Sequence, residues 1–219
     1  WDDAAVEEMS MTDNVLDLMA QRLASAPALS KRILLACALF GDTVPLCVAC
    51  VVEAPYQEVA RAIQALIEDG YVTMTGPHQL DDISETEARS CEGTGSVMEI
   101  TFAHDRIRQA AHQLGTAEDR TEVHNRIANL YANGITQPSN AIAILIAHHT
   151  VECMGAGSKD TTIRRLLEGG KAALAESAVT QAQTVLRAAL TLLPAGDAHA
   201  PRERCLLYTS PSPRDRQKS

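Results

Sequence analysis

The alternation of apolar and polar residues changes its period near the middle of the chain. Every second residue from Met98 to Phe102 is apolar, which is typical of a half-buried strand. From Ile107 onward the apolar residues recur at three- and four-residue spacing, which predicts a helix. His104 and Asp105 occupy the junction. A helix that begins there directs unpaired N–H groups and the positive end of its dipole beyond the strand, an arrangement that favours phosphate.

Upstream of this junction the pattern predicts short helices, one strand and a long loop. Ser30 and Gly41 are suited to cap the two ends of one helix, and Gly70 is suited to the left-handed position after another. Three helices, a strand, a loop and a returning strand indicate a winged helix with a two-stranded wing. The predicted elements are a helix that starts after Thr12 and ends before Pro27, helices over residues 31–40, 45–52 and 55–69, a strand over 71–75, a mobile loop over 76–96 and a strand over 97–102.

Downstream of the junction the pattern predicts a series of helices. Thr116 and Asp119 resemble a capping box, with Asp in place of Glu or Gln. Gly169 and Gly170 would let neighbouring helices approach closely, as in an antiparallel hairpin of a TPR-like array. No period recurs often enough to prove a repeat. The predicted helices are one after residue 116 and three over residues 141–154, 161–176 and 178–193.

The composition supports a mainly α fold. Of the 219 residues 46% are hydrophobic but only 3% aromatic, which favours helices packed through small side chains. The formal charge of −9 opposes binding to nucleic acid and to anionic membranes. No apolar run reaches the roughly 18 residues that a membrane span needs. We therefore expect a cytoplasmic protein with neither nucleic acid nor membrane as a partner.

Neither the cysteines nor the histidines form a metal motif. Cys47 and Cys50 are the only close pair among six cysteines, and no second Cys or His pair stands at finger-like spacing. We interpret both thiols as small buried hydrophobes. His148 and His149 are adjacent, so they lie on diverging faces of one helix rather than at ligand spacing. The sequence predicts no catalytic residue and no metal site.

Several stretches resemble the region that follows the ATPase core in STAND-type AAA modules. These modules are signal-transduction NTPases within large serine/threonine kinases, hybrid histidine kinases and cyclase-linked receptors. The most specific stretch is Phe-Ala-His-Asp-Arg-Ile at residues 102–107, and the likeness continues loosely to about residue 193. The other matching stretches are residues 1–2, 12–15, 34–41 and 108–111.

The resemblance implies a parent protein in which a phosphate-loop ATPase core precedes a winged helix and helical repeats. The chain contains no Gly-x-x-x-x-Gly-Lys-Ser/Thr loop and no apolar run ending in a magnesium-binding Asp. We therefore expect the chain itself to hold no cofactor and to hydrolyse no ATP, while ADP or ATP with Mg²⁺ belongs to the parent. The implied function is regulatory: it couples nucleotide state to an effector kinase or cyclase domain. The implied partners are the upstream core in cis and proteins that bind the helical region.

His104 and Asp105 are also similar to the Met-His-Asp motif of plant resistance and apoptotic NTPases, with Ala103 in place of Met. In that motif the histidine reaches the β-phosphate of ADP and holds the closed state. The resemblance implies nucleotide sensing by His104 and Asp105. A second interpretation is that one of them only caps the helix, which contributes ~1 kcal/mol. Both interpretations remain open, and Arg106 and Arg108 are expected to be solvated charges on the helix face.

The expected domain organisation has four parts. Residues 1–25 form a linker helix from a missing ATPase core, residues 26–115 the winged helix and residues 116–204 the helical repeat-like region. Residues 205–219 carry two prolines and a reversed charge, and they resemble translated adapter sequence. That tail is excluded from the fold reasoning.

Two other functions stay open. A winged-helix DNA-binding transcriptional regulator would read bases with the helix over 55–69. That helix carries Arg61 against Glu58, Glu68 and Asp69, whereas DNA recognition needs basic or amide side chains. A ligand-free helical protein-interaction scaffold is compatible with residues 116–204.

Overall fold

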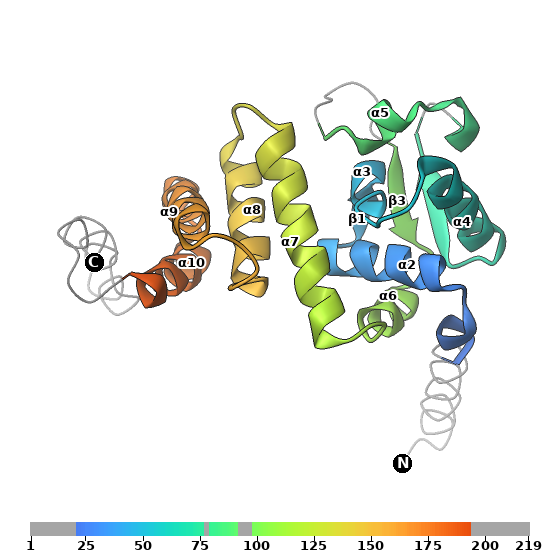
Figure 1. The fold of residues 1–219 in the computed structure, drawn as a ribbon, viewed down its shortest axis with the longest axis horizontal. Coiled ribbons are helices and arrows are strands. Elements are labelled where there is room, and N and C mark those ends of the chain that lie inside the picture. The colour runs from blue at the N-terminus through green and yellow to red at the C-terminus, as the bar shows by residue number, and fades with distance from the viewer. Residues whose placement is uncertain (1–20, 77–78, 92–97, 194–219) are drawn as a thin grey trace, which may run out of the picture. The chain divides into compact units, whose positions relative to one another are not determined.

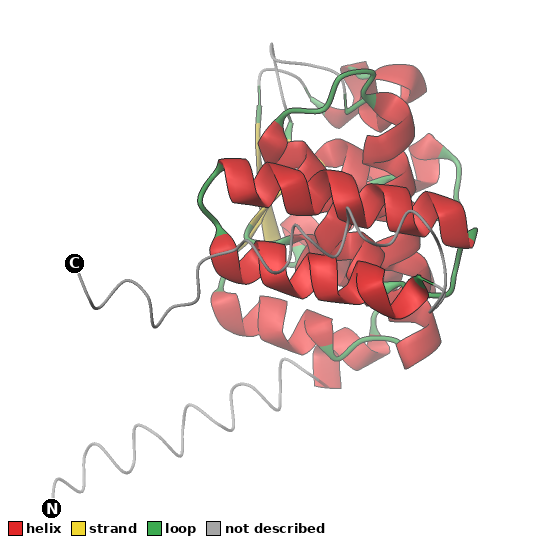
Figure 2. Cartoon of the chain, turned by 90° about the vertical axis from the view of Figure 1, so that its left-hand side faces the viewer, coloured by secondary structure: helices red, strands yellow, loops and turns green. Residues whose placement is uncertain are grey.

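The structure is a computed structural model that describes residues 21–76, 79–91 and 98–193. These residues are mainly helical and contain one small antiparallel sheet, as expected (Figure 1). In Figure 2 most of the described residues are drawn as helices, and the strands form only a small part. The predicted helix after Thr12 lies almost wholly outside the described residues, although residues 21–25 are helical. The tail over 205–219 lies outside them as well.

The chain divides into two compact units, one up to Arg126 and one from Ile127. In the first unit, helix α2 packs against α3, α4 and α6, and the apolar side chains between these helices form the core. Its fully buried side chains include Ile33, Leu34, Val48, Ile63 and Ile107. The elements of this unit are α2 (Ala28–Phe40), β1 (Thr43–Pro45), α3 (Leu46–Ala49), α4 (Tyr56–Glu68), β2 (Val72–Thr75), the 3-10 turn η1 (Leu80–Asp82), α5 (Glu85–Arg89), β3 (Glu99–Phe102), α6 (Asp105–His112) and the first part of α7 (Ala117–Gly134).

Strand β3 is the centre of a three-stranded sheet with the order β1-β3-β2. The predicted antiparallel pairing of β2 with β3 is confirmed, with Val72 opposite Phe102. The prediction of only two strands is wrong, because β1 pairs antiparallel with the other edge of β3 and places Val44 opposite Ile100. Strand β1 could not be predicted from the sequence, because this strand is only three residues long and ends at Pro45. Proline has no N–H to donate and is therefore confined to edge strands and strand ends.

The alternation along β3 is the one that the sequence predicted. Ile100 and Phe102 are buried, whereas Glu99 and Thr101 are only half-buried. The C-terminal end of α4 is also as expected. Gly70 takes the left-handed conformation (φ 73°) after α4, and Tyr71 N–H donates to Leu66 O at 2.9 Å.

The predicted start of α2 is wrong. The helix begins at Ala28, three residues before the expected start, and Ser30 is buried inside it at 4% exposure instead of capping it. Pro27 holds the N-cap position, where its fixed φ suits the helix entry. The third predicted helix is shorter than residues 45–52, since α3 covers only Leu46–Ala49.

The expected capping box at the start of α7 is confirmed: Thr116 N–H donates to Asp119 Oδ2 at 2.7 Å, and Asp119 N–H donates to Thr116 Oγ1 at 3.2 Å.

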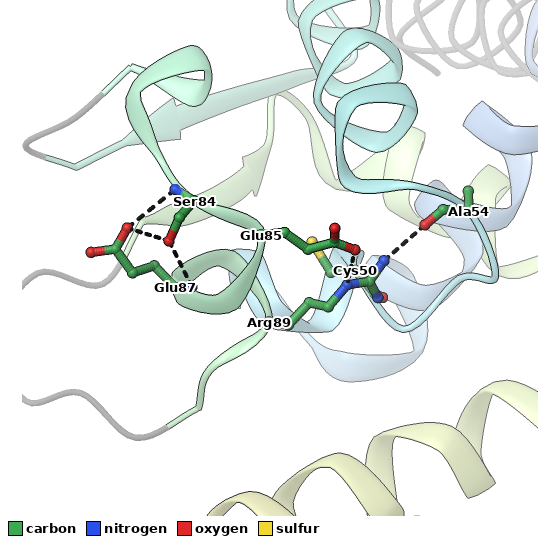
Figure 3. A network of polar contacts seen from close by, with 6 residues as sticks. All are labelled: Cys50, Ala54, Ser84, Glu85, Glu87 and Arg89. Carbon is green, nitrogen blue, oxygen red and sulfur yellow. Dashed lines mark hydrogen bonds and ion pairs between the residues drawn. The ribbon is translucent and has the colours of Figure 1, made fainter.

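The expectation of a mobile loop over residues 76–96 is wrong for residues 79–91. Ser84 and Glu87 form a capping box that starts α5, and Leu80 and Ala88 are buried. Arg89 anchors the segment: its Nη1 donates to Cys50 O at 2.7 Å and its Nη2 to Ala54 O at 2.8 Å (Figure 3). The guanidinium thereby satisfies carbonyl groups that the short helix α3 and the following turn leave without intrahelical partners.

A buried hydrogen bond fixes the other end of this segment. The Tyr56 hydroxyl donates to Leu80 O at 2.8 Å. Burial raises the pKa of Tyr56 to about 12, so the phenol keeps its proton and its donor role at neutral pH. The segment is therefore held to α3 and α4 at both of its ends.

Replacing Arg89 with Met should release this segment while retaining the apolar part of the side chain. The two hydrogen bonds to carbonyl groups and the exposed ion pair with Glu85 are lost, but the side chain is 36% exposed, so we expect ~1–2 kcal/mol of local stability to be lost. A glutamate-specific protease should then cleave after Glu85 or Glu87 about tenfold faster.

The matched control is Arg61→Met, because Arg61 donates only to Gln57 O within its own helix. Equal cleavage rates for the Arg89 variant and the unaltered chain would show that the anchor does not hold the segment.

The second unit begins within α7 and continues with α8 (Asn140–Glu152), α9 (Lys159–Ala175) and α10 (Val179–Leu192). Helix α9 packs against both α8 and α10. Asn140 at the start of α8 donates to Glu176 after the end of α9 at 2.8 Å, so these two helices run antiparallel. Ser139 and Ser158 cap α8 and α9. The small core contains Ala147, Leu166, Val185 and Ala189.

The predicted close approach at the glycine pair is confirmed. A Cβ on Gly169 would lie 2.1 Å from Ala147 Cβ and 2.8 Å from Ala143 O, so α8 crosses directly over this residue. A Cβ on Gly170 would lie 2.4 Å from Leu186 Cδ2 of α10. The two adjacent glycines thus allow α9 to pack tightly on both of its neighbours.

Gly169→Ala should destabilise the second unit although alanine is the better helix former. The propensity gain is about 1 kcal/mol, but the overlap with the α8 backbone forces the helices apart. We expect a net loss of ~1–3 kcal/mol, measured as a lower midpoint of urea unfolding.

Gly157→Ala provides the control, because its added methyl group would have Thr162 Oγ1 as its nearest neighbour at 4.0 Å. A Gly169→Ala variant as stable as this control would contradict the tight contact.

Candidate functional site

The candidate site begins where the central strand of the sheet ends. Ala103 continues the pairing beyond β3, since its N–H donates to Tyr71 O at 3.0 Å. His104 follows with an extended backbone (φ −145°, ψ 142°) and holds the N-cap position of α6. Its carbonyl accepts from Ile107 N–H at 3.0 Å and closes the first turn. The strand therefore delivers His104 to the start of the helix, as the change of period indicated.

The imidazole of His104 is exposed and makes no hydrogen bond to any described residue. The capping interpretation requires a side-chain bond to the N–H groups of the first turn, and His104 makes none. Asp105 does not supply the cap either, because it lies inside the helix at its first position. The interpretation that either side chain caps α6 is therefore wrong. The first-turn N–H groups of α6 therefore have no side-chain cap from His104, and the exposed imidazole belongs to the residue at that end of the helix.

The carboxylate of Asp105 forms hydrogen bonds with side chains of its own helix. Its Oδ1 accepts from Arg108 Nη2 at 2.8 Å and its Oδ2 from Gln109 Nε2 at 2.8 Å. The hydrogen bond from Arg108 is the main reason that the pKa of Asp105 lies below its usual range. A carboxylate at the first turn also suits the positive end of the helix dipole. The two predicted site residues are thus adjacent but differ in availability: His104 is uncommitted and Asp105 is engaged.

Arg108 connects this helix to the end of α2. Besides Asp105 it binds Asp42, with Nε 3.0 Å from Oδ1. The expectation of a solvated Arg108 is therefore wrong, because its side chain is only 27% exposed and bridges two carboxylates. No sequence signal marked Asp42, which lies far from Arg108 along the chain and is brought close by the packing of α6 on α2.

The close cysteine pair is buried, as the sequence analysis expected. Cys47 and Cys50 are 4% and 2% exposed, and Cys37 lies in the same core at 1%. Burial raises the pKa of Cys37 and of Cys50 to about 12. A thiol reacts as its thiolate, so these side chains have little nucleophilic character at neutral pH.

The adjacent histidines of α8 point to different environments. His148 is exposed and His149 is 1% exposed, with the ring centroids 5.2 Å apart in an edge-to-face arrangement. Within the described ranges, no group of three or more His, Cys, Asp or Glu side chains is arranged to hold a metal ion. Nor does this part of the chain contain a helix that is both long and apolar enough to cross a membrane.

Comparisons with protein-family models, with curated proteins and with solved structures gave no match.

Arg108→Met should return the pKa of Asp105 toward its ordinary value, because the variant removes the strongest hydrogen bond to the carboxylate. The depressed pKa means that the carboxylate contributes to stability above about pH 4, and that this contribution is lost as the pH falls through the folded-state pKa. Carbon-detected NMR titration of the Asp105 carboxyl group measures the shift. His104→Ala is the control and should leave the Asp105 titration unchanged. An identical Asp105 pKa with and without Arg108 would contradict the assignment.

Proposed function

We propose that this chain is the regulatory part of a nucleotide-switched signal-transduction ATPase of the STAND type. In this proposal the first unit is a winged helix that closes on an ADP-loaded core, and the second is a TPR-like region that receives or relays the signal of a protein partner. The effector is a kinase or cyclase domain of the parent protein. The chain itself supplies no phosphate loop, so the ADP or ATP and its Mg²⁺ are held by the core.

The order and pairing of the elements support the winged-helix part of the proposal. The chain runs from α2 through the short edge strand β1 to α3 and α4, and then through the antiparallel strands β2 and β3. The segment with η1 and α5 lies between β2 and β3, in the position of a wing. The small antiparallel sheet beside helices α2, α3 and α4 is compatible with this proposal.

The observation that carries the proposal is the free imidazole of His104 at the N-terminus of α6. An imidazole that caps nothing and forms no internal hydrogen bond gains a partner only from outside the described residues. The start of a helix is favourable for an anionic ligand, because first-turn N–H groups and the helix dipole both point at it. A phosphate oxygen of ADP is the partner that the resemblance implies for this position.

The switch follows from a difference between two states. When the winged helix is docked on the ADP-loaded core, His104 donates a hydrogen bond to the β-phosphate, and when the unit swings away the bond is lost. Nucleotide thus favours one arrangement and a partner on the helical region favours the other. Asp105 acts indirectly, because its bonds to Arg108 and Gln109 hold the first turn of α6 in place.

The DNA-binding alternative gains no support from the side chains of α4. Arg61 is turned back to Gln57 O, and Gln64 donates to Glu68 at 3.0 Å. Two of the three basic or amide side chains of the helix are thus engaged within it, next to the carboxylates of Glu58, Glu68 and Asp69, and the third is Gln57.

The test is made in the parent protein, with the upstream core expressed in frame. His104→Ala should weaken ADP binding by roughly ten- to a hundredfold and raise basal signalling, since a hydrogen bond to a charged group contributes about 1.5–3 kcal/mol. His104→Leu should do the same while keeping apolar volume. ADP affinity is measured by calorimetry, and the melting temperature of each variant by differential scanning fluorimetry.

The melting temperature should not change, because the His104 side chain makes no internal hydrogen bond. His148→Ala, which alters an exposed histidine on α8, is the matched control. Unchanged ADP affinity in both His104 variants would end the sensing hypothesis, and an upstream reading frame without a phosphate loop would end the proposed class.

A further inference from the structure

The first unit contains a cavity of about 300 Å³ that none of the proposed functions uses. One wall is the face of α2 with Lys31, Arg32 and Leu35, and the opposite wall is the face of α7 that ends at Arg126. All the residues that line the cavity belong to the unit that ends at Arg126. The volume is at the lower end of the range for sites that bind small molecules.

The walls of the cavity are held by fixed contacts rather than by a loose loop. Arg126 donates to Val51 O at 3.1 Å and is paired with Glu53 at 2.7 Å, which ties α7 to the turn after α3. Gly115 (φ 82°) lies so close to α2 that an added Cβ would be 2.9 Å from Leu35 Cδ2. These contacts hold α7 to the turn after α3 at one end of the cavity and hold the residues before α7 against α2 at the other.

The interior is largely apolar. Leu35, Val52, Leu114 and Val123 contribute to its lining, and Val52 and Val123 are among the buried hydrophobic residues of the unit. A site that combines apolar walls with a few polar groups binds a ligand with an apolar body and places its polar end.

Among the lining residues the cationic side chains outnumber the carboxylates, although the whole chain carries −9 and Glu53, outside the lining, pairs with Arg126. Three cationic side chains face two carboxylates, and most of these groups already have partners. Lys31 donates to Ala24 O, Arg126 is paired with Glu53 and Glu122, and Asp119 is bound by Thr116.

Arg32 is the exception. It forms no ion pair or hydrogen bond with another described residue, and it acts on Asp119 only through its longer-range field. Its guanidinium is therefore the one charged group of the lining without a hydrogen bond or ion pair to a described residue, and a guanidinium binds a carboxylate through two parallel hydrogen bonds. Lys31 has no carboxylate partner either, but its ammonium group already donates to Ala24 O. A dianion is disfavoured, since Asp119 and Glu122 lie on the opposite wall.

We propose that the cavity between α2 and α7 binds a small monocarboxylate with an apolar body, whose carboxylate pairs with Arg32 and whose hydrocarbon part packs on Leu35, Val52 and Val123. Such a ligand touches α2 and α7 at once. Binding therefore stabilises the docked position of the first half of α7. The proposal is independent of nucleotide sensing, because the site contains neither His104 nor Asp105.

Octanoate, with 1-octanol as its neutral counterpart, tests the proposal on the full chain. Titration followed by amide chemical shifts should show saturable changes at Leu35, Val52 and Val123, with a Kd on the order of 1 mM. Octanoate should also raise the melting temperature as its concentration passes the Kd. Octanol should bind roughly tenfold more weakly, because it lacks the charge that Arg32 pairs with.

Arg32→Gln should weaken octanoate binding by roughly tenfold or more and leave octanol binding unchanged. Arg32 is exposed, so this variant should keep the melting temperature of the ligand-free chain. Arg61→Gln, on the surface of α4, is the matched control and should bind octanoate normally. Val123→Phe fills the cavity and should abolish both titrations.

Three results would overturn the proposal. The first is the absence of saturable shifts around the cavity, and the second is equal affinity for octanoate in the Arg32→Gln variant and the unaltered chain. The third is octanol binding as tight as octanoate binding, which would leave an apolar cavity without selectivity for a carboxylate. None of these results would bear on ADP sensing, which is measured on different residues.

Discussion

The first unit depends on the need of β3 to pair its backbone on both edges. A strand in the middle of a sheet has no solvent for its N–H and C=O groups, so each edge must find a partner. The pairing with β2 satisfies one edge and the pairing with β1 the other, which places Ile100 between Val44 and Met74. With its edges paired and its apolar face buried, β3 has one possible register, because a slip by one residue would expose Ile100 and Phe102. The position of His104, two residues beyond the strand, is set by that register.

Elements with a strong local signal were predictable from the sequence, whereas elements fixed by distant partners were not. The β3 to α6 junction and the glycines at 70, 169 and 170 were predictable, because each rests on a strong local signal: a change of period, a left-handed cap or adjacent small residues. Strand β1 was not, since three residues ending in proline carry no periodicity and are fixed only by pairing with a distant strand. Helix α5 was missed for a different reason. Its Ser84 and Glu87 have the capping-box spacing, but the polar composition of residues 76–96 outweighed that local signal.

The candidate site also has one feature that was predictable and one that was not. The place of His104 followed from the pattern of the chain, whereas the difference in availability between His104 and Asp105 did not. That difference depends on rotamers and on Arg108, whose second partner Asp42 comes from the end of α2. The cavity was even less predictable. Its walls come from segments far apart in the chain. That Arg32 lacks a hydrogen bond or ion pair to a described residue is seen only once the partners of Lys31, Asp119 and Arg126 are known.

Helix α6 places the two proposed ligand sites at the ends of one short element. It begins directly after His104 and leads into Leu114 and Gly115, which line the cavity. Ile107, Ala110 and Ala111 are buried along it, and it packs on α2, which also forms the cavity wall that carries Arg32. A helix of eight residues packed in this way moves as a rigid piece rather than bending between its ends.

If nucleotide binding at one end and carboxylate binding at the other favour different positions of α6, each ligand must change the affinity of the other by the same factor. If both favour the same position, the coupling is positive. Its sign would then show whether the cavity ligand acts with ADP to hold the closed state or against it.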